Sequence, residues 1–463
     1  MKPTLGKLIK FSAVCAIVSS ICLAPAQIYA TKHTTPTAPA TTQQVSVKAT
    51  SIKSIDVKAN DKFEDLQFLK KVLADKRVVM LGESSHGAAE FNKSKVRLSQ
   101  FLHKEMGFNV IAFESGLGDA SGTYAEISKL TPEESLRKSI YPVWHTKEMI
   151  PLYTYIKQQS EAKKPLILTG FDMQPNNGYG RFMKTWFEPI DTSFAEKART
   201  LEGKLTDIYF NMDWDKANWD KDYADLLVGY TEIQTFLNKH QVALQAAFPG
   251  NKTIMPIMNR VIEDRIYMIQ NVLKHQVAYN NLTMENYVVS TNLRENMAYL
   301  RDEMMASTLT WLIDNIYKDE KIIVWGHNYH IRKNNSSIES LVQIHPYAGG
   351  SVPNMTELMP SRIKKQTYVI GQFMYEGETA GNDGTPMPVN SKHSPTSLEA
   401  ILKKSGYPYS FVDLTIQHNK SWKDSIRNGM YWGLIEEPFV PSEQYDGILF
   451  IQKTSAVEYL TFK

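Results

Sequence analysis

Short, unbroken runs of apolar residues recur along the chain, and each run ends on polar residues. Strands covered on both faces give continuous apolar runs, whereas half-exposed strands alternate apolar and polar residues. The pattern therefore predicts an α/β fold in which helices flank a central, largely parallel sheet. The predicted strands cover residues 78–81, 110–113, 165–169, 322–325, 368–373 and 447–451.

The pattern changes between residues 176 and 315, where helical periodicity replaces the strand-like runs. Apolar residues there recur at the spacing of one face of a helix, over segments of 20 residues or more. We expect a helical subdomain inserted between the third and fourth strands, placed as a lid over the cleft. Residues 61–463 would then form one domain that includes this insertion.

The first 30 residues have the pattern of a secretory signal peptide. A basic start is followed by an apolar run from Phe11 to about Leu23, and then by small residues that favour cleavage after Ala26 or Ala30. The alternative is an uncleaved membrane anchor, for which the run is short. We expect a secreted or extracytoplasmic protein that meets the membrane only through this signal. Residues 31–60, rich in Thr, Ala and Pro, are predicted to be a flexible leader.

Composition narrows the chemistry. The chain has 463 residues, 43% of them hydrophobic, which is enough for a large core. Its net charge is only +3 and its lysines are spread along the chain, so nothing suggests a nucleic-acid partner. The two cysteines, Cys15 and Cys22, both lie in the predicted signal. A mature protein without cysteine has no disulfide, no thiolate nucleophile and no Cys-ligated metal.

Acidic and imidazole side chains follow four of the predicted strands. An acid after one strand is usually a turn or capping residue. If the four strands are parallel neighbours, however, their carboxyl ends meet at one edge of the sheet and their side chains converge on one crevice. The residues concerned are Glu83 with His86, Glu114, Asp172, and His327 with His330.

Histidine beside a carboxylate suits proton abstraction from water. Imidazole titrates near neutrality, and an adjacent carboxylate fixes its tautomer. The chain contains no G-x-S-x-G sequence, so a serine acyl-enzyme of the usual α/β-hydrolase kind is not supported. We therefore expect a His-activated water to attack an ester or lactone carbonyl. Candidate substrate-binding residues, some of which would steady the oxyanion, are Lys95, Arg97, Asp172, Gln174 and Arg301.

Two other uses of the crevice stay open. His327 and His330, with His86 and two glutamates, supply enough nitrogen and oxygen ligands for Zn, Mn or Fe, which would make the protein a metal-dependent hydrolase. A non-catalytic protein that binds haem or a metal ion in the same crevice is the second alternative. The leading hypothesis needs no cofactor.

The segment GESSHGAAEF, residues 82–91, resembles the signature G-E-x-[ST]-H-G-x-x-E-F of the erythromycin esterase family. GFNVIAFES, GFDMQ, WGHNYHIRK, HSPTSLEAIL (around Ser397 and Glu399) and YDGILFIQKTSA are similar to its later motifs, in the same order. The resemblance spans about Leu66 to Thr454. Two positions depart from the family pattern: Lys95 stands where the resistance esterases have arginine, and Met355 is followed by Thr356 instead of glycine.

The resemblance implies that His86 is a general base that activates water. It also implies that Glu83, Glu114, His327 and His330 shape and polarise the site around His86. The expected fold is a core sheet related to the ChaN-like haem-uptake fold, with a helical subdomain over the cleft. The expected activity is hydrolysis of a small-molecule ester or lactone, with the macrolactone of erythromycin-type antibiotics as the named substrate.

Overall fold

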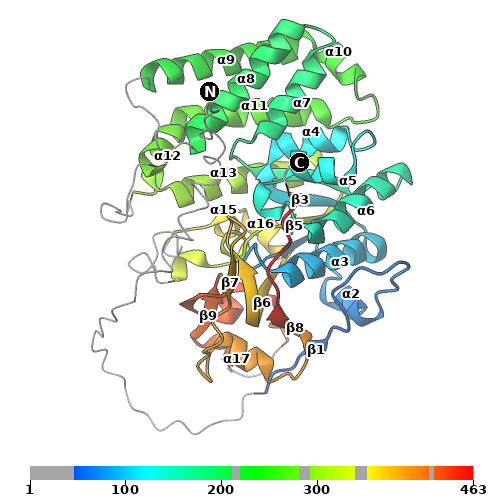
Figure 1. Cartoon of the computed structure of the whole chain (residues 1–463), viewed down its shortest axis with the longest axis vertical. Helices are drawn as coiled ribbons and strands as arrows, with labels where there is room; N and C mark the ends of the chain where they lie inside the picture. The colour runs from blue at the N-terminus through cyan, green and yellow to red at the C-terminus, as the bar shows by residue number, and fades with distance from the viewer. Residues whose placement is uncertain (1–45, 211–218, 281–291, 339–351, 417–421, 462–463) are drawn as a thin grey trace, which may run out of the picture.

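The computed structural model describes residues 46–210, 219–280, 292–338, 352–416 and 422–461. The predicted signal peptide and residues 31–45 of the predicted leader lie outside these ranges. Within them the chain forms a mostly parallel, nine-stranded sheet flanked by helices, as the apolar runs predicted (Figure 1).

Six neighbouring strands of the sheet are parallel, in the spatial order β11-β6-β2-β5-β3-β4. All six were predicted from continuous apolar runs, and their inner residues are buried. They are β2 (Val78–Leu81), β3 (Phe108–Gly116), β4 (Ile167–Asp172), β5 (Lys321–Trp325), β6 (Thr367–Ala380) and β11 (Gly447–Thr454). Antiparallel strands complete the sheet: β8 (Tyr409–Asp413) beside β11, β1 (Thr50–Ser51) beside β8, and β7 (Pro386–Pro388) beside β6.

Successive side chains of each strand enter different cores, because they point to opposite faces of the sheet. Val79 and Leu81 belong to one buried cluster, while Val78 and Met80 belong to the other. The first core packs against α3 (Ala89–Met106) and α6 (Ile150–Glu161). The second packs against the helical subdomain. Two covered faces explain why the strands read as unbroken apolar runs.

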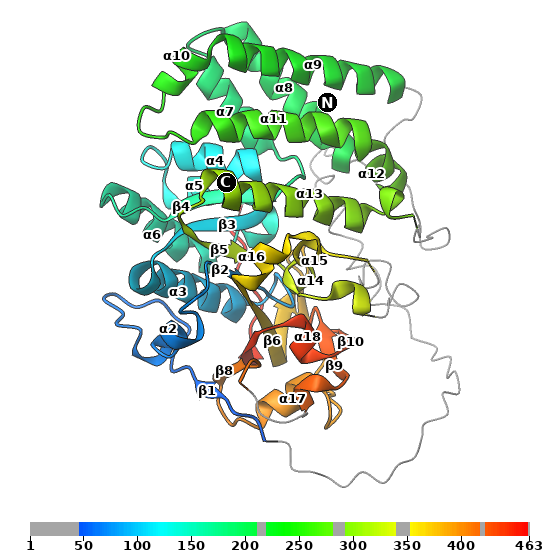
Figure 2. The ribbon, with the colours of Figure 1, turned by 180° about the vertical axis from the view of Figure 1, so that it is seen from behind.

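The helical subdomain lies between β4 and β5 in the chain, where the insertion was expected. In Figures 1 and 2 its helices stack on one side of the sheet, and α13 packs against β4. The helices are α7 (Asn177–Phe187), α8 (Thr192–Phe210), α9 (Trp219–Lys239), α10 (Gln241–Ala246), α11 (Ile254–Asn271), α12 (Leu273–Asn280) and α13 (Met297–Trp311). Among the described residues, no helix has the length and apolar character needed to cross a bilayer.

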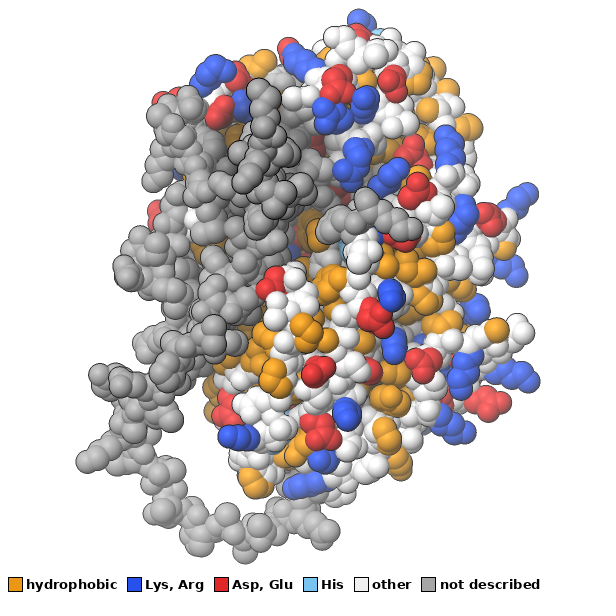
Figure 3. Space-filling model, viewed as in Figure 1, with side chains coloured by type: hydrophobic (Ala, Val, Ile, Leu, Met, Phe, Trp, Pro, Cys, Tyr) orange, Lys and Arg blue, Asp and Glu red, His pale blue; other side chains and the backbone are white. Residues whose placement is uncertain are grey.

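Shorter helices connect the strands. Of these, α4 (Leu117–Ala125) follows β3 directly, and α14 (Asn328–Ile331) begins with His327 as its N-cap. The others are α2 (Leu69–Val72), α5 (Pro132–Ser139), α15 (Met355–Leu358), α16 (Ser361–Lys365), α17 (Leu398–Lys403) and α18 (Pro441–Gln444). On the face shown in Figure 3, acidic and basic side chains are interspersed.

The described end of the predicted leader is packed against the domain. Residues 50 and 51 pair with β8 as β1, and Ile52 and Ile55 are buried. The prediction of a flexible leader over residues 31–60 is therefore wrong for residues 50–55. The polar composition of the leader concealed two isoleucines that bury apolar area against the sheet.

A two-stranded hairpin near the C-terminus was not predicted. It consists of β9 (Arg427–Tyr431) and β10 (Ile435–Phe439), and it lies beside α17 at the end of the molecule opposite the helical subdomain (Figure 2). The two strands contain Arg427, Asn428, Glu436 and Pro438, so they lack the apolar runs that revealed the buried strands.

Candidate active site

Four adjacent strands carry the predicted site residues at their carboxyl ends. The order β2-β5-β3-β4 places Glu83 and His86 next to His327 and His330, then Glu114 and Asp172. Glu114 and Asp172 lie within their strands, since β3 continues past an irregularity between Phe113 and Gly116 and pairs with Asp172. The convergence expected from parallel strand ends is present in the structure.

His86 is held by the carboxylate of Glu83. Its Nδ1 lies 2.9 Å from Oε1 of Glu83, which also accepts a hydrogen bond from Nε1 of Trp144 at 3.0 Å. The other oxygen, Oε2, is paired with Nζ of Lys95, whose pKa burial lowers well below its usual range. Because an ionised carboxylate only accepts hydrogen bonds, Nδ1 of His86 is the donor. The lone pair of neutral His86 is therefore on Nε2, which no described residue bonds.

The environment keeps His86 neutral. Burial lowers the pKa of His86 to about 4, and the positive charges of His330 and Arg301 act in the same direction against the attraction of Glu114. The side chain is 11% exposed, whereas that of Glu83 is 1% exposed. Water can thus reach an imidazole that is fixed in orientation and free of a proton at Nε2.

The loop that carries His86 is tied down by glycine. Gly87 accepts hydrogen bonds from Ala380 at 2.9 Å and Val457 at 3.0 Å, so it joins the ends of β6 and β11. A Cβ atom at Gly87 would overlap the backbone of Ala380. This close approach of two backbones accounts for a glycine directly after the histidine.

A second group of charges surrounds Arg301, which α13 carries in from the helical subdomain. Its guanidinium donates to Oε1 of Glu114 at 2.8 Å and to Oδ2 of Asp172 at 2.5 Å. Burial opposes the ionisation of Glu114, but the charges of His330 and Arg301 hold the pKa of that carboxyl well below its usual range. Arg301 therefore joins the ends of β3 and β4 to the helical subdomain.

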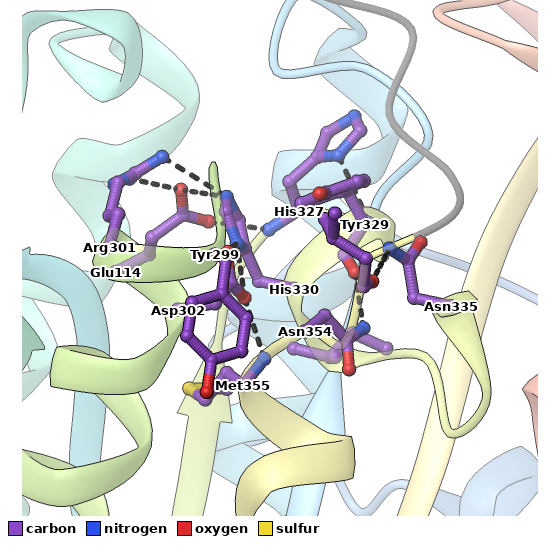
Figure 4. A network of polar contacts seen from close by, with 12 residues as sticks. Glu114, Tyr299, Arg301, Asp302, His327, Tyr329, His330, Asn335, Asn354 and Met355 are labelled. Atoms are coloured by element: carbon purple, nitrogen blue, oxygen red, sulfur yellow. Dashed lines mark hydrogen bonds and ion pairs between the residues drawn. The ribbon is translucent and has the colours of Figure 1, made fainter. Parts of the chain in front are cut away.

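His330 lies between two carboxylates, as Figure 4 shows. Its Nδ1 is 2.9 Å from both oxygens of Asp302, and its Nε2 is 3.2 Å from Oε1 of Glu114. Burial opposes protonation, but Asp302 and Glu114 raise the pKa of His330 to about 9. At neutral pH this histidine is an imidazolium whose Nδ1 faces Asp302 and whose Nε2 lies between Glu114 and Nη1 of Arg301.

His327 supplies a third kind of imidazole. Its Nδ1 accepts a hydrogen bond from the backbone nitrogen of Tyr329 at 3.2 Å, so the proton of the neutral ring is on Nε2. Burial is the main cause that holds the pKa of His327 well below its usual range. Among the described residues Nε2 has no well-formed hydrogen bond, and the backbone of Ser84 is the group that interacts with the ring. This nitrogen is a buried donor, and the His327 and His86 ring centres are 5.1 Å apart.

Two predicted substrate-binding residues are placed otherwise than expected. Arg97 lies on α3, where it donates to Asp61 at 2.7 Å and to Asp65 at 2.7 Å, so it fastens the N-terminal segment and does not enter the crevice. Lys95 is fully buried behind Glu83, over the ring of Trp325. A role for either residue in contacting substrate is not supported, because their charges are already taken up by carboxylates.

The remaining predicted residue, Gln174, lies beside the site. Its backbone nitrogen donates to Asp172 at 3.2 Å, and its amide group reaches Tyr209 of α8 at 3.4 Å. Its carbonyl accepts from the hydroxyl of Tyr141 at 3.0 Å. Gln174 thus connects β4 to the helical subdomain.

Sequence reasoning missed three contributors to the site. Asp302 follows Arg301 directly on α13, but an acid in an amphipathic helix is usually a surface residue, and nothing in the sequence pairs it with His330. Trp144 and Trp432 come from distant connections and flank His86, with ring-centre separations of 4.8 and 5.3 Å. A tryptophan outside the strands gives no sequence signal for this placement.

A metal ion at this site was one of the alternatives that the sequence left open. Across the ranges that the structure describes, no three His, Cys, Asp or Glu side chains are grouped as ligands for a metal ion. The carboxylates are instead paired with cationic or imidazole groups. Glu83 pairs with Lys95, Glu114 and Asp172 pair with Arg301, and Asp302 pairs with His330.

Fold and site together define an α/β protein with histidine and carboxylate groups at the carboxyl edge of a largely parallel sheet. The family model described as erythromycin esterase matches residues 103–454. The chain belongs to the erythromycin esterase family. The matched range includes Glu114, Asp172, Arg301, His327 and His330, while the loop with Glu83 and His86 precedes it.

Individual relatives agree with this assignment. The chain is 36% identical to "Putative hydrolase YbfO" of Bacillus subtilis over 402 residues, which cover 85% of this chain and 87% of the relative. It is 23% identical to erythromycin esterase type II of Escherichia coli over 432 residues, covering 88% and 97% of the two chains. A mutant of the erythromycin esterase EreC, solved in its open conformation, has the same fold, with a TM-score of 0.58 and 17% identity over 85% of this chain and 94% of EreC.

Proposed function

We propose that the protein is an exported esterase-like hydrolase in which neutral His86 activates water for attack on an ester or lactone carbonyl. The observation that carries the proposal is the hydrogen bond from Nδ1 of His86 to Glu83, which leaves the lone pair on Nε2 of a side chain that is 11% exposed. Family membership supports a hydrolase, and two relatives from Escherichia coli are named erythromycin esterases.

In the proposed reaction Nε2 of His86 takes a proton as the water oxygen bonds to the carbonyl carbon. The carbonyl oxygen becomes an oxyanion, and the Nε2–H group of His327 is the donor that we assign to it. Collapse of the tetrahedral species breaks the bond to the alkoxide, which takes the proton from His86. Glu83 stabilises the imidazolium that forms in between. A neutral His327 suits this role. Because its pKa is lowered, the ring does not take up a second proton near neutral pH, and the proton on Nε2 stays in place as the donor.

The test is hydrolysis by wild-type protein and by His86→Ala, measured on simple aryl esters, lactones and an erythromycin-type macrolide. We expect the variant to lose roughly 10³-fold or more in kcat, with circular dichroism unchanged. Unchanged turnover would refute the mechanism. Each assay is repeated after chelation, because loss of activity that Zn or Mn restores would favour the metal-dependent alternative. A coloured, stoichiometric ligand with no hydrolysis would favour a binding protein.

Export rests on the basic, apolar and small-residue pattern of residues 1–30. We expect the protein in the extracytoplasmic fraction, with a mature N-terminus that follows Ala26 or Ala30. Cell fractionation with N-terminal sequencing decides this. Full-length protein in the membrane fraction would indicate an anchor instead.

A further inference from the structure

The tip of the β9–β10 hairpin reaches the loop that carries His86. At this tip the backbone nitrogen of Trp432 donates to the carbonyl of Ser84 at 2.9 Å. Trp432 has φ = 56° and Gly433 has φ = 71°, so two consecutive residues are left-handed. That conformation is unfavourable for a bulky side chain and persists only where the surroundings fix it. The hairpin is therefore built to present an indole at this place.

The indole of Trp432 contacts both catalytic imidazoles. It lies edge-on to His86, with ring centres 5.3 Å apart, and it stacks on His327 at 5.5 Å with an angle of 26° between the planes. Trp144 lies edge-on to His86 as well, at 4.8 Å. Trp144 is buried, whereas Trp432 is partly exposed. Trp432 is thus a partly exposed aromatic side chain next to the imidazole that would activate water.

From this geometry, and on the basis of the proposed function, we propose that Trp432 is a specificity-determining residue. Its ring forms the wall of the substrate site beside His86, and it selects esters that carry an apolar ring, aromatic or alicyclic, next to the scissile carbonyl. The same wall keeps bulk water from His86. A substrate with such a ring beside its carbonyl contacts the indole. A substrate with a methyl group at that position leaves most of the indole uncovered.

A buried glutamate holds the hairpin in position. Oε1 of Glu399 accepts a hydrogen bond from the backbone nitrogen of Met430 at 2.8 Å, two residues before Trp432. Glu399 lies in α17, whose N-cap is Ser397, so the motif of Ser397 and Glu399 in the sequence acquires a role. The carbonyl of Gly433 accepts from the nitrogen of Asn390 at 2.8 Å on the other side of the tip.

The surroundings of Glu399 favour this positioning role. Its Oε2 lies 3.9 Å from Nδ1 of His393, and both side chains are fully buried. Nε2 of His393 donates to the carbonyl of Tyr375 at 2.6 Å, so this histidine is fixed to β6 and faces the carboxyl group on α17 without a hydrogen bond between them. Burial raises the pKa of Glu399 to about 7. A glutamine keeps the acceptor for Met430, whereas a leucine removes it.

The experiment compares kcat/KM within two series of esters. In 4-nitrophenyl acetate, 4-nitrophenyl cyclohexanecarboxylate and 4-nitrophenyl benzoate, the group on the acyl side of the carbonyl varies. In methyl acetate and phenyl acetate, the group on the alcohol side varies. The ring preference is the ratio of kcat/KM for the ester with the varied ring to kcat/KM for the ester with a methyl group in its place. In Trp432→Ala we expect this ratio to fall by about tenfold or more. Trp432→Phe should retain most of it, and Tyr407→Ala, at an exposed aromatic residue outside the site, should match wild type. A preference in Trp432→Ala equal to that of wild type would overturn the proposal.

A second readout follows the titration of His86. The groups that face this residue are Glu83, Glu114, His327, His330 and Arg301, and none of them is changed in Trp432→Ala. Because burial is the main cause of the low pKa of His86, opening the site to water should move the acid limb of kcat/KM from about 4 toward the ordinary value near 6.5. An acid limb unchanged in folded Trp432→Ala would contradict the shielding role.

Glu399 is tested with two variants. Glu399→Leu should reproduce the lost ring preference of Trp432→Ala, while Glu399→Gln should resemble wild type. Folded Glu399→Leu with the wild-type preference would overturn the positioning role, and if this variant does not fold, Trp432→Ala still decides the main proposal. Activity retained by His86→Ala would remove the proposed function itself. Inactive His86→Ala together with wild-type preference in Trp432→Ala would remove only this inference.

Discussion

Glu83 precedes His86 by three residues, and its carboxylate bonds the Nδ1 atom of that histidine at 2.9 Å while its second oxygen is paired with Lys95. A single short loop therefore supplies both the imidazole and the group that orients it. The buried lysine and the indole of Trp144 in turn orient the carboxylate. The geometry of this loop leads directly to the first prediction.

Replacing Glu83 by glutamine removes the charge that fixes the tautomer of His86. The amide can donate to Nδ1, which would put the proton on Nε2 and take away the lone pair needed for attack on water. We expect kcat for ester hydrolysis to fall roughly 10²–10⁴-fold. The matched control is Glu105→Gln, at an exposed residue that pairs with Lys70 on the surface. Full activity in folded Glu83→Gln would contradict the role of the carboxylate.

The pH dependence of kcat/KM follows from two histidines with opposite shifts. His86 must be neutral to take a proton, and its pKa of about 4 predicts activity that rises with pH through that value. His330 is an imidazolium with a pKa of about 9, and its loss of a proton should weaken the field around the oxyanion as pH rises further. We expect a plateau between about 4 and about 9, measured in a constant-ionic-strength buffer series. A single limb near 6.5 would contradict both assignments.

Stability should depend on His330 in the same range. The folded pKa of His330 lies above its unfolded value of about 6.5, so the imidazolium contributes stability that is fully present below pH 6.5 and is lost as pH rises through about 9. We expect the Tm of the wild-type protein to fall over this interval. In His330→Gln the fall should be smaller, and the overall Tm lower, because Asp302 is left buried without its cation. Thermal denaturation at several pH values measures both effects.

Arg301 and Arg294 lie seven residues apart in the sequence but have different surroundings. Arg301 binds the buried carboxylates of Glu114 and Asp172, whereas Arg294 is exposed and pairs with Glu303. Arg301→Ala should destabilise the protein by about 3–5 kcal/mol, since it leaves the buried carboxylate of Asp172 without its cation and Glu114 with His330 alone. Arg294→Ala should change stability by less than about 1 kcal/mol. Urea denaturation of both variants gives the comparison, and equal losses would contradict the placement of Arg301.

Arg97 provides a test of its corrected position. Because it donates to Asp61 and Asp65 and to the carbonyl of Ser54, Arg97→Ala should release the N-terminal segment and cost roughly 2–4 kcal/mol of stability. Limited proteolysis should then cut between residues 46 and 66 earlier than in wild type. We expect kcat to stay within about twofold of wild type while the protein is folded. A large loss of kcat in the folded variant would contradict this placement and would indicate that Arg97 acts in the active site.

The sheet and the line of site residues along its edge were predictable, because both depend on local patterns. Val78–Leu81 and Ile322–Trp325 are apolar on both faces, and each leads into its histidines within five residues. What the sequence could not show is pairing at a distance. Asp302 acts on His330 only because α13 packs over β4, and Trp432 reaches His86 only because the hairpin folds back. Lys95 and Arg97 were predicted to bind substrate because they lie close to His86 in the sequence. Two residues that are two positions apart on a helix, however, lie on different faces of it.

The position of β5 has a consequence for how the protein forms. This strand lies between β2 and β3, yet it follows both of them in the chain and is synthesised only after the whole helical subdomain. A growing polypeptide that ends before Lys321 therefore holds Glu83, His86 and Glu114 on two strands with nothing to join them. The ladder closes when β5 enters the gap, and the same event delivers His327 and His330. Assembly of the catalytic groups thus depends on long-range contacts, and such contacts are slow to form.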